Sequence, residues 1–183
     1  SVLDILDKEK NANYNRGKFE PLGAVTIDDI NKNRELYKAK GLEAIRSGKA
    51  AAVPLAGGQG TRLGFDKPKG MFNMGVSREL FIFECLINNL MKVVDEAGAW
   101  VPLYIMTSEK NHDDTTSFFE EKNYFGYNKD FVRFFIQDMA PSVGYDGKIL
   151  MEGKGRISSS PNGNGGWFSS MVRAGLLSDL KEK

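Results

Sequence analysis

The stretch from Ala50 to Gly70 constrains the fold more than any other part of the sequence. It begins with a short apolar run, breaks into glycines between Gly57 and Gly64, and ends in Lys67-Pro68-Lys69-Gly70. An apolar run stopped by glycines is typical of a buried strand that enters a tight loop. Because glycine has no Cβ, such a loop brings backbone N–H groups close to an anion, and phosphate is the usual guest. The stretch therefore predicts a phosphate site at the C-terminal end of the first strand.

The glycine loop departs from the two common phosphate motifs. No Gly-Lys pair is followed by Ser or Thr, which excludes a Walker A loop. Gly58 and Gly60 fit the dinucleotide pattern, but Leu63 stands at the position of the third glycine. A plain glycine-rich turn without a ligand stays open as an alternative, and so does a Rossmann dehydrogenase. The latter needs an acidic residue about 20 positions on, at the end of a second strand, whereas Glu79 and Glu84 lie in a predicted helix start.

Composition excludes several classes of function. The chain has 183 residues, which favours one domain with a sizeable core. Its 25 basic and 24 acidic residues give no global attraction to nucleic acid or to an anionic membrane. The single cysteine, Cys85, excludes an internal disulfide and suits a reducing compartment. With neither a signal peptide nor a long apolar run, we expect a soluble, cytoplasmic protein of unknown oligomeric state.

Three apolar runs alternate with two helical patterns after residue 49. This order predicts a parallel sheet built from right-handed βαβ units. Ligands of such sheets bind outside the carboxyl ends of the strands. The expected strands are 50–55, 101–106 and 131–136, and the expected helices are 79–97 and 109–122.

Gln137 directly follows the third of these strands. We therefore expect it to share a crevice with the glycine loop. Its amide offers an acceptor and two donor protons, which match the edge of a uracil ring. The alternative is a solvent-exposed amide. His112 has Asp113 and Asp114 beside it, too few ligands for a metal site, and is expected to be a polar surface residue.

The segments before and after this core are predicted to be irregular or helical. Residues 1–10 suggest one or two helical turns before a loop. Thr26 with Asp29 indicates an N-cap, and the helix 27–47 is expected to bend at Gly41 and stop at Gly48. Short hairpin strands around 148–151, a second glycine loop at 161–166 and a helix at 167–177 complete the chain. The apolar positions expected to be buried in the first helix are Ile30, Leu36, Leu42 and Ile45.

Residues 55–71, LAGGQGTRLGFDKPKGM, are similar to the signature of the UTP-dependent sugar-1-phosphate uridylyltransferases, specifically the UDP-N-acetylglucosamine pyrophosphorylase group. Residues 135–141, 145–149 and 161–166 match further segments in the same order. The resemblance covers about residues 53–177. It implies an α/β, Rossmann-like nucleotide-diphospho-sugar transferase fold, with a mixed, mostly parallel sheet flanked by helices. Because family members are at least twice this long, we expect an N-terminal portion with an incomplete sheet, made of a helical extension (1–48) and part of the catalytic domain (49–183).

The resemblance also implies a mechanism and its residues. The sugar phosphate attacks the α-phosphorus of UTP in line, with Arg62 on the pyrophosphate side, Lys69 near the reacting phosphates and Mg²⁺ between phosphate oxygens. Asn164 is the expected sugar contact, whereas Asn162 replaces the usual Asp and has no assigned role. No carboxylate stands out as a metal ligand. The residues expected against the nucleotide are Leu55, Ala56, Gly57, Gly58, Gly60, Thr61, Gln137, Pro161, Gly163 and Gly165.

Three hypotheses for the function follow. The first is a uridylyltransferase that joins UTP to N-acetylglucosamine 1-phosphate and releases pyrophosphate. The second is the same reaction on glucose 1-phosphate, and GQGTRLG with PKGM favours the former. The third is a module that binds UTP without turning it over.

Overall fold

The computed structural model describes residues 20–182. The helical turns predicted for 1–10 and the loop predicted for 11–18 lie outside them. Contacts divide the chain into two compact units, one made of Lys38–Ala140 and Pro161–Lys183, the other of Ser1–Tyr37 and Pro141–Ser160. The first unit contains the sheet and both glycine loops.

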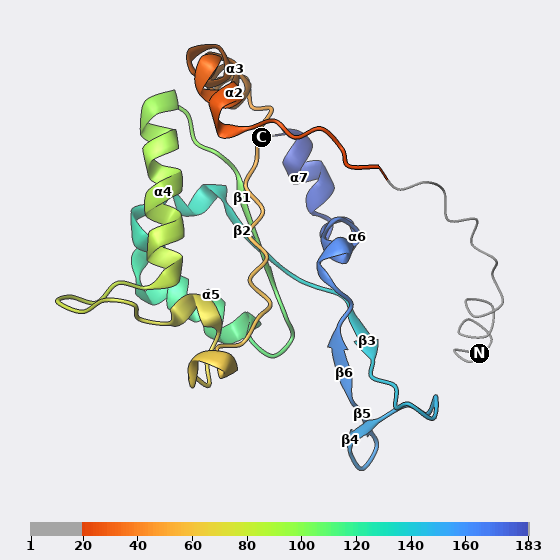
Figure 1. The fold of residues 1–183 in the computed structure, drawn as a ribbon. Coiled ribbons are helices and arrows are strands. Elements are labelled where there is room, and N and C mark those ends of the chain that lie inside the picture. The colour runs from red at the N-terminus through yellow and green to blue at the C-terminus, as the bar shows by residue number, and fades with distance from the viewer. Residues whose placement is uncertain (1–19, 183) are drawn as a thin grey trace. The chain divides into compact units, whose positions relative to one another are not determined.

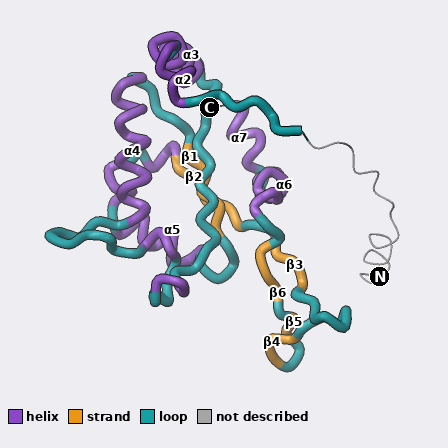
Figure 2. The backbone as a smooth tube through the Cα atoms, viewed as in Figure 1, coloured by secondary structure: helices purple, strands orange, loops and turns teal. Residues whose placement is uncertain are grey.

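A parallel strand pair forms the centre of the first unit. Strand β1 (Leu103–Thr107) pairs in parallel with β2 (Val132–Ile136). Segment 52–56 runs parallel along the other edge of β1, through bridges at Ala52 and Leu55. Figure 2 draws this segment as loop because the pairing is interrupted, and Pro54, which has no N–H, lies at its middle. The predicted parallel direction is thus confirmed, whereas the strand expected at 50–55 is reduced to isolated bridges.

Helices cover both faces of this sheet (Figure 1). On one face, α4 (Ile82–Ala97) and α5 (His112–Glu121) bury residues such as Phe83, Ile87 and Phe119 against β1. On the other, α6 (Trp167–Arg173) and α7 (Leu176–Glu182) pack against a smaller cluster around Met171. The apolar spacing within these segments explains the burial, since residues three and four apart share a helix face.

Some boundaries differ from the sequence-based expectation. α4 begins at Ile82 rather than at 79, because the preceding residues form a loop held by Asn73 and Glu84. The helix expected at 167–177 is two helices, and Gly175, with φ of +73°, lies between them. Leu86, an apolar residue of α4, is 50% exposed.

The N-terminal helices are α2 (Ile27–Lys32) and α3 (Arg34–Arg46). The predicted cap is confirmed, since Thr26 Oγ1 accepts from Asp29 N–H at 3.2 Å and Asp29 Oδ2 accepts from Thr26 N–H at 3.1 Å. The expected bend at Gly41 is wrong: the helices break at Asn33. Burial of Ile30 and Leu36 is wrong too, because they are 45% and 53% exposed.

The hairpin predicted around 148–151 is present slightly later in the chain, where β4 (Met151–Gly153) pairs with β5 (Arg156–Ile157). It lies between two further short strands that were not part of the predicted hairpin, β3 (Met139–Pro141) and β6 (Ser159–Pro161), which pair with each other. In the described part of the chain, no helix is both long and apolar enough to cross a bilayer. The remaining single turns are 3₁₀ helices at Thr61–Leu63, Lys69–Met71, Asn123–Gly126, Lys129–Phe131 and Asn164–Gly166.

Candidate functional site

The glycine loop after segment 52–56 is closed by its own backbone. Gly60 N–H donates to Lys67 O at 2.9 Å, and Lys69 N–H donates to Gly58 O at 3.1 Å. A Cβ on Gly60 would lie 2.8 Å from the carbonyl oxygen of Phe65, so only glycine fits there. The amide of Gly60 therefore shapes the loop, and any contact of Gly60 with a ligand has to come from its other atoms.

A basic pocket opens on this loop. Its volume is about 400 Å³, and its lining includes Gly58, Thr61, Arg62 and Lys69. The side chains of Arg62 and Lys69 are exposed, and within residues 20–182 neither forms an ion pair. Two cations without counter-charges make the pocket attractive to an anion. Gln59 also lines it, with a buried Oε1 that has no hydrogen-bond partner in the described chain, and the sequence-based set had not included this residue.

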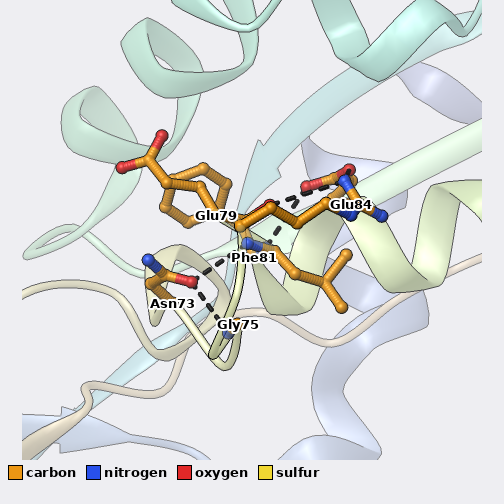
Figure 3. Close-up of polar contacts among 7 residues, drawn as sticks. Asn73, Gly75, Glu79, Phe81 and Glu84 are labelled. Carbon is orange, nitrogen blue, oxygen red and sulfur yellow. Dashed lines mark hydrogen bonds and ion pairs between the residues drawn. The ribbon is translucent and has the colours of Figure 1, made fainter.

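The chain that follows Lys69 is fixed by the packing of Gly70 and by hydrogen bonds to Asn73. The next residue, Gly70, lies so close to the Phe83 ring that a Cβ would stand 2.1 Å from it. The loop that follows is braced by Asn73, whose Oδ1 accepts from the N–H groups of Gly75 and Leu80 at 2.9 and 3.0 Å (Figure 3). The backbone of Lys69 thus has a defined position while its ammonium group stays exposed.

Gln137 lies directly against Gly57. A Cβ on Gly57 would stand 2.4 Å from Gln137 Nε2 and 2.8 Å from its Cδ. Gln137 is 6% exposed, which excludes the solvent-exposed alternative. Its backbone N–H donates to Thr107 O at 2.8 Å, but its buried Nε2 has no partner among the described residues. An amide buried without a partner costs free energy unless a ligand completes its hydrogen bonds.

The second glycine loop is anchored next to Gln137. Asn162 N–H donates to Asp138 O at 3.0 Å, and Asp138 N–H donates to Ser170 Oγ at 3.0 Å. The Asp138 carboxylate pairs with Arg173. The structure therefore brings the start of this loop to the chain directly after Gln137. Four residues proposed for binding are exposed here, namely Pro161, Gly163, Asn164 and Gly165.

A polar cluster around Thr107, whose carbonyl oxygen accepts from the Gln137 N–H, was not predicted from the sequence. Thr107 Oγ1 donates to Phe135 O at 3.1 Å. Because a hydroxyl has one proton, its 2.7 Å contact with His112 Nδ1 makes the imidazole the donor. His112 is therefore not the surface residue that was expected, but a partly buried one. Asn111, directly before His112, is another buried polar residue, and its place at the N-cap of α5 differs from the helix expected from residue 109.

The described residues do not form a metal centre. No group of three or more His, Cys, Asp or Glu side chains within residues 20–182 is placed to hold an ion. The groups available to a ligand are therefore cations and amides. They are Arg62 and Lys69 at one pocket, the unpartnered amide of Gln137 at a strand end, and the two glycine loops.

Comparison with known proteins shows which family the chain resembles. A family model described as UTP–glucose-1-phosphate uridylyltransferase matches residues 4–183. A probable UDP-N-acetylglucosamine pyrophosphorylase of Dictyostelium discoideum is 40% identical over 100% of this chain and 39% of its own length. Another, from Schizosaccharomyces pombe, is 35% identical over 96% of this chain and 38% of its own length. The chain thus spans about two fifths of these curated relatives.

A solved structure agrees with the sequence relatives. The uridine diphosphate N-acetylglucosamine pyrophosphorylase of Trypanosoma brucei superposes with a TM-score of 0.73 at 36% identity, covering 80% of this chain and 30% of that protein. The α/β, nucleotidyltransferase-like fold expected from the sequence is confirmed by this superposition.

Proposed function

Since the chain belongs to the UTP–glucose-1-phosphate uridylyltransferase family, we propose that it is the UTP-binding portion of an enzyme that makes UDP-N-acetylglucosamine. The substrates are UTP and N-acetylglucosamine 1-phosphate, and the second product is pyrophosphate. Relatives 35% to 40% identical carry the pyrophosphorylase name for this sugar, which supports the choice of substrate.

The position of Gln137 carries the proposal. Its buried Nε2 lies against Gly57 and has no partner among the described residues. A uracil edge supplies the carbonyl acceptor and the N3–H donor that a carboxamide needs, whereas cytosine has an acceptor at N3 in place of that donor. A site that leaves a polar group unpaired with the wrong ligand discriminates strongly. Gln137 is therefore the base-reading residue, and Gly57, Gly163 and Gly165 flank the uridine.

The reaction asks for positioning and charge neutralisation. An oxygen of the sugar phosphate forms a bond to the α-phosphorus of UTP, the bond from that phosphorus to the bridging oxygen breaks, and pyrophosphate leaves with the electron pair. The nucleophile is already an anion, so no proton has to be removed. Arg62 neutralises the pyrophosphate side and Lys69 holds the phosphates near the reacting centre, from the pocket that they line.

The divalent ion is Mg²⁺ in this proposal, and it would supply positive charge that neutralises the phosphates. The described side chains do not supply a ligand cluster for it, so no residue of this chain is assigned to the ion and no step is routed through it. Leu55 and Ala56 line a smaller pocket of about 210 Å³ with Lys69, beside the phosphate loop. Asn164 is the proposed sugar contact, and the location proposed for the protein is the cytoplasm.

Glucose 1-phosphate is the alternative sugar substrate, because the family model carries that name. Binding of UTP without turnover is the other alternative for a chain of this length. Pyrophosphate release from UTP with each sugar phosphate in turn decides between the two substrates, and release with neither, despite UTP binding, supports the binding module.

Calorimetric titration with UTP, CTP and ATP tests the base assignment. We expect selective binding of UTP, and the Gln137→Ala variant is expected to lose about tenfold or more in affinity for UTP, because two hydrogen bonds to the base are removed. Equal affinity for UTP and CTP in the unmodified protein would contradict the assignment of Gln137.

A further inference from the structure

Asn111 lies at the start of α5, but its side chain does not cap the helix. An asparagine at an N-cap usually accepts from an amide in the first turn of its helix. Asn111 makes no such bond, and it is 0% exposed. Instead, its Oδ1 accepts from Ser108 N–H at 2.7 Å, and its Nδ2 donates to Ala56 O at 3.0 Å. The carboxamide thus forms its hydrogen bonds with two chains of the sheet and none with the amides of the helix.

These two bonds replace one rung of the ladder between segment 52–56 and β1. Every second amide of β1 donates to the segment, Tyr104 N–H to Ala52 O and Met106 N–H to Pro54 O. The next rung of a parallel ladder joins Ser108 N–H to Ala56 O. Here both atoms bond to Asn111, so a carboxamide is inserted between the two chains. They are held apart at the point where Gly57 begins.

The separation matters for Gln137. Gln137 follows β2, and Gly57 follows the segment on the opposite edge of β1. Neighbouring strands are about 4.8 Å apart, so the Gln137 side chain has to cross the end of β1 to reach Gly57, as the 2.4 Å approach of its Nε2 to a Cβ position on Gly57 requires. The carboxamide of Asn111 sets the position of Gly57, the residue that the Gln137 side chain reaches after crossing the end of β1.

We propose that Asn111 is a positioning residue for the uracil subsite: by holding Ala56 and Ser108 apart, it places Gly57 at the separation from Gln137 that the base requires. This inference rests on the proposed function, because it takes Gln137 to read the base. Asn111 itself touches no substrate. Its effect passes through Gly57, the residue directly after its partner Ala56.

Two substitutions separate this role from a structural one. In Asn111→Ala and Asn111→Ser, Ser108 N–H becomes free to bond directly to Ala56 O, which closes the sheet and moves Gly57. The serine introduces a side-chain N-cap acceptor for α5, which Asn111 does not supply, so this variant is expected to fold even where the alanine variant does not. The matched control is Thr115→Val. Thr115 is a 0% exposed polar residue of the same helix, and its hydroxyl has no partner among the described residues.

The experiment compares steady-state kinetics of the full-length protein and its variants with UTP and with CTP. For Asn111→Ser, we expect the KM for UTP to rise about tenfold, the preference for UTP over CTP to fall by a similar factor, and kcat with UTP to stay within about twofold, because a displaced binding contact weakens substrate binding. Thr115→Val is expected to keep both the KM and the preference of the unmodified protein.

A second measurement does not depend on turnover. In the full-length protein with ¹⁵N-labelled glycine and glutamine, the signals of the Gly57 amide and the Gln137 side-chain amide are expected to shift in Asn111→Ser and not in Thr115→Val. Unshifted signals, or an unchanged preference for UTP, overturn the role of Asn111. If the unmodified protein does not prefer UTP while the signals do shift, the base assignment fails and the separation of the chains by Asn111 stands.

Discussion

Replacing Gly57 by alanine tests the contact on which the base assignment depends. The new Cβ would lie 2.4 Å from Gln137 Nε2, about 1 Å closer than ordinary van der Waals contact. Gly57 has no positive φ, so the backbone accepts alanine. The clashing atoms belong to the far end of a flexible side chain, which is displaced at a cost of about 1 kcal/mol, at the lower end of overpacking penalties. We therefore expect a folded protein whose Gln137 amide has moved by about 1 Å or more.

That displacement is expected to raise the dissociation constant for UTP by roughly 10- to 100-fold, because two hydrogen bonds to the base lose their geometry and leave buried groups unpaired. The assay is calorimetric titration with UTP and with CTP. Urea unfolding measures stability in parallel, with Gly58→Ala as the control for stability. A Cβ on Gly58 meets nothing within 4 Å, so that variant stiffens the same loop without touching Gln137.

The double variant Gly57→Ala/Gln137→Ala sharpens the test. If both single substitutions act through the same amide, their effects on UTP affinity are not additive, and the double variant binds no more weakly than Gln137→Ala by itself. Wild-type affinity and wild-type preference for UTP in Gly57→Ala would refute the reasoning, since the Gln137 amide would then not lie where the contact requires.

Three further predictions concern separate parts of the molecule. Arg62→Ala is expected to lower kcat by roughly 100-fold or more with unchanged stability, and Arg62→Lys to recover only part of the lost kcat, because the ammonium lacks the guanidinium fork. The control is Arg156→Ala, which removes an exposed arginine of β5. Wild-type activity of Arg62→Ala would remove this residue from the mechanism. Gly41 lies in the exposed middle of α3, and a Cβ there meets nothing within 4 Å. Gly41→Ala is therefore expected to raise the free energy of unfolding by about 1 kcal/mol, and a loss of stability in urea unfolding would contradict this prediction. Burial raises the pKa of Tyr127 from 10.0 to about 12, so the neutral phenol favours the folded state: the stability it contributes is complete below pH 10 and is lost as the pH rises from 10 towards 12. Urea unfolding between those pH values measures the loss, and a smaller slope is expected for Tyr127→Phe, with an unchanged slope arguing against the shift.

Local signals carried much of the fold. The cap formed by Thr26 and Asp29, the helix stop at Gly98 and the apolar runs of β1 and β2 each depend on residues close in sequence, and the structure contains all of them. The helix breaks were less predictable. Gly41 was expected to bend its helix, but the chain breaks at Asn33, whose Nδ2 donates to Asp29 O at 3.2 Å. A side-chain bond of this kind competes with helix continuation and has no signature in apolar spacing.

The sequence by itself determined that the first glycine loop and Gln137 stand at the carboxyl ends of parallel strands, because the alternation of strands and helices and the βαβ hand follow from local patterns and general rules. Only the tertiary structure decided which atoms meet there. The Gln137 amide lies against Gly57, the amide of Gly60 is used within its own loop, and Asn111 bonds to two chains instead of capping α5. The physical reason is that a polar side chain takes the best-placed partner once the chain is packed. For Asn111 one of those partners, Ala56, is 55 residues away in the sequence, beyond the reach of any local pattern.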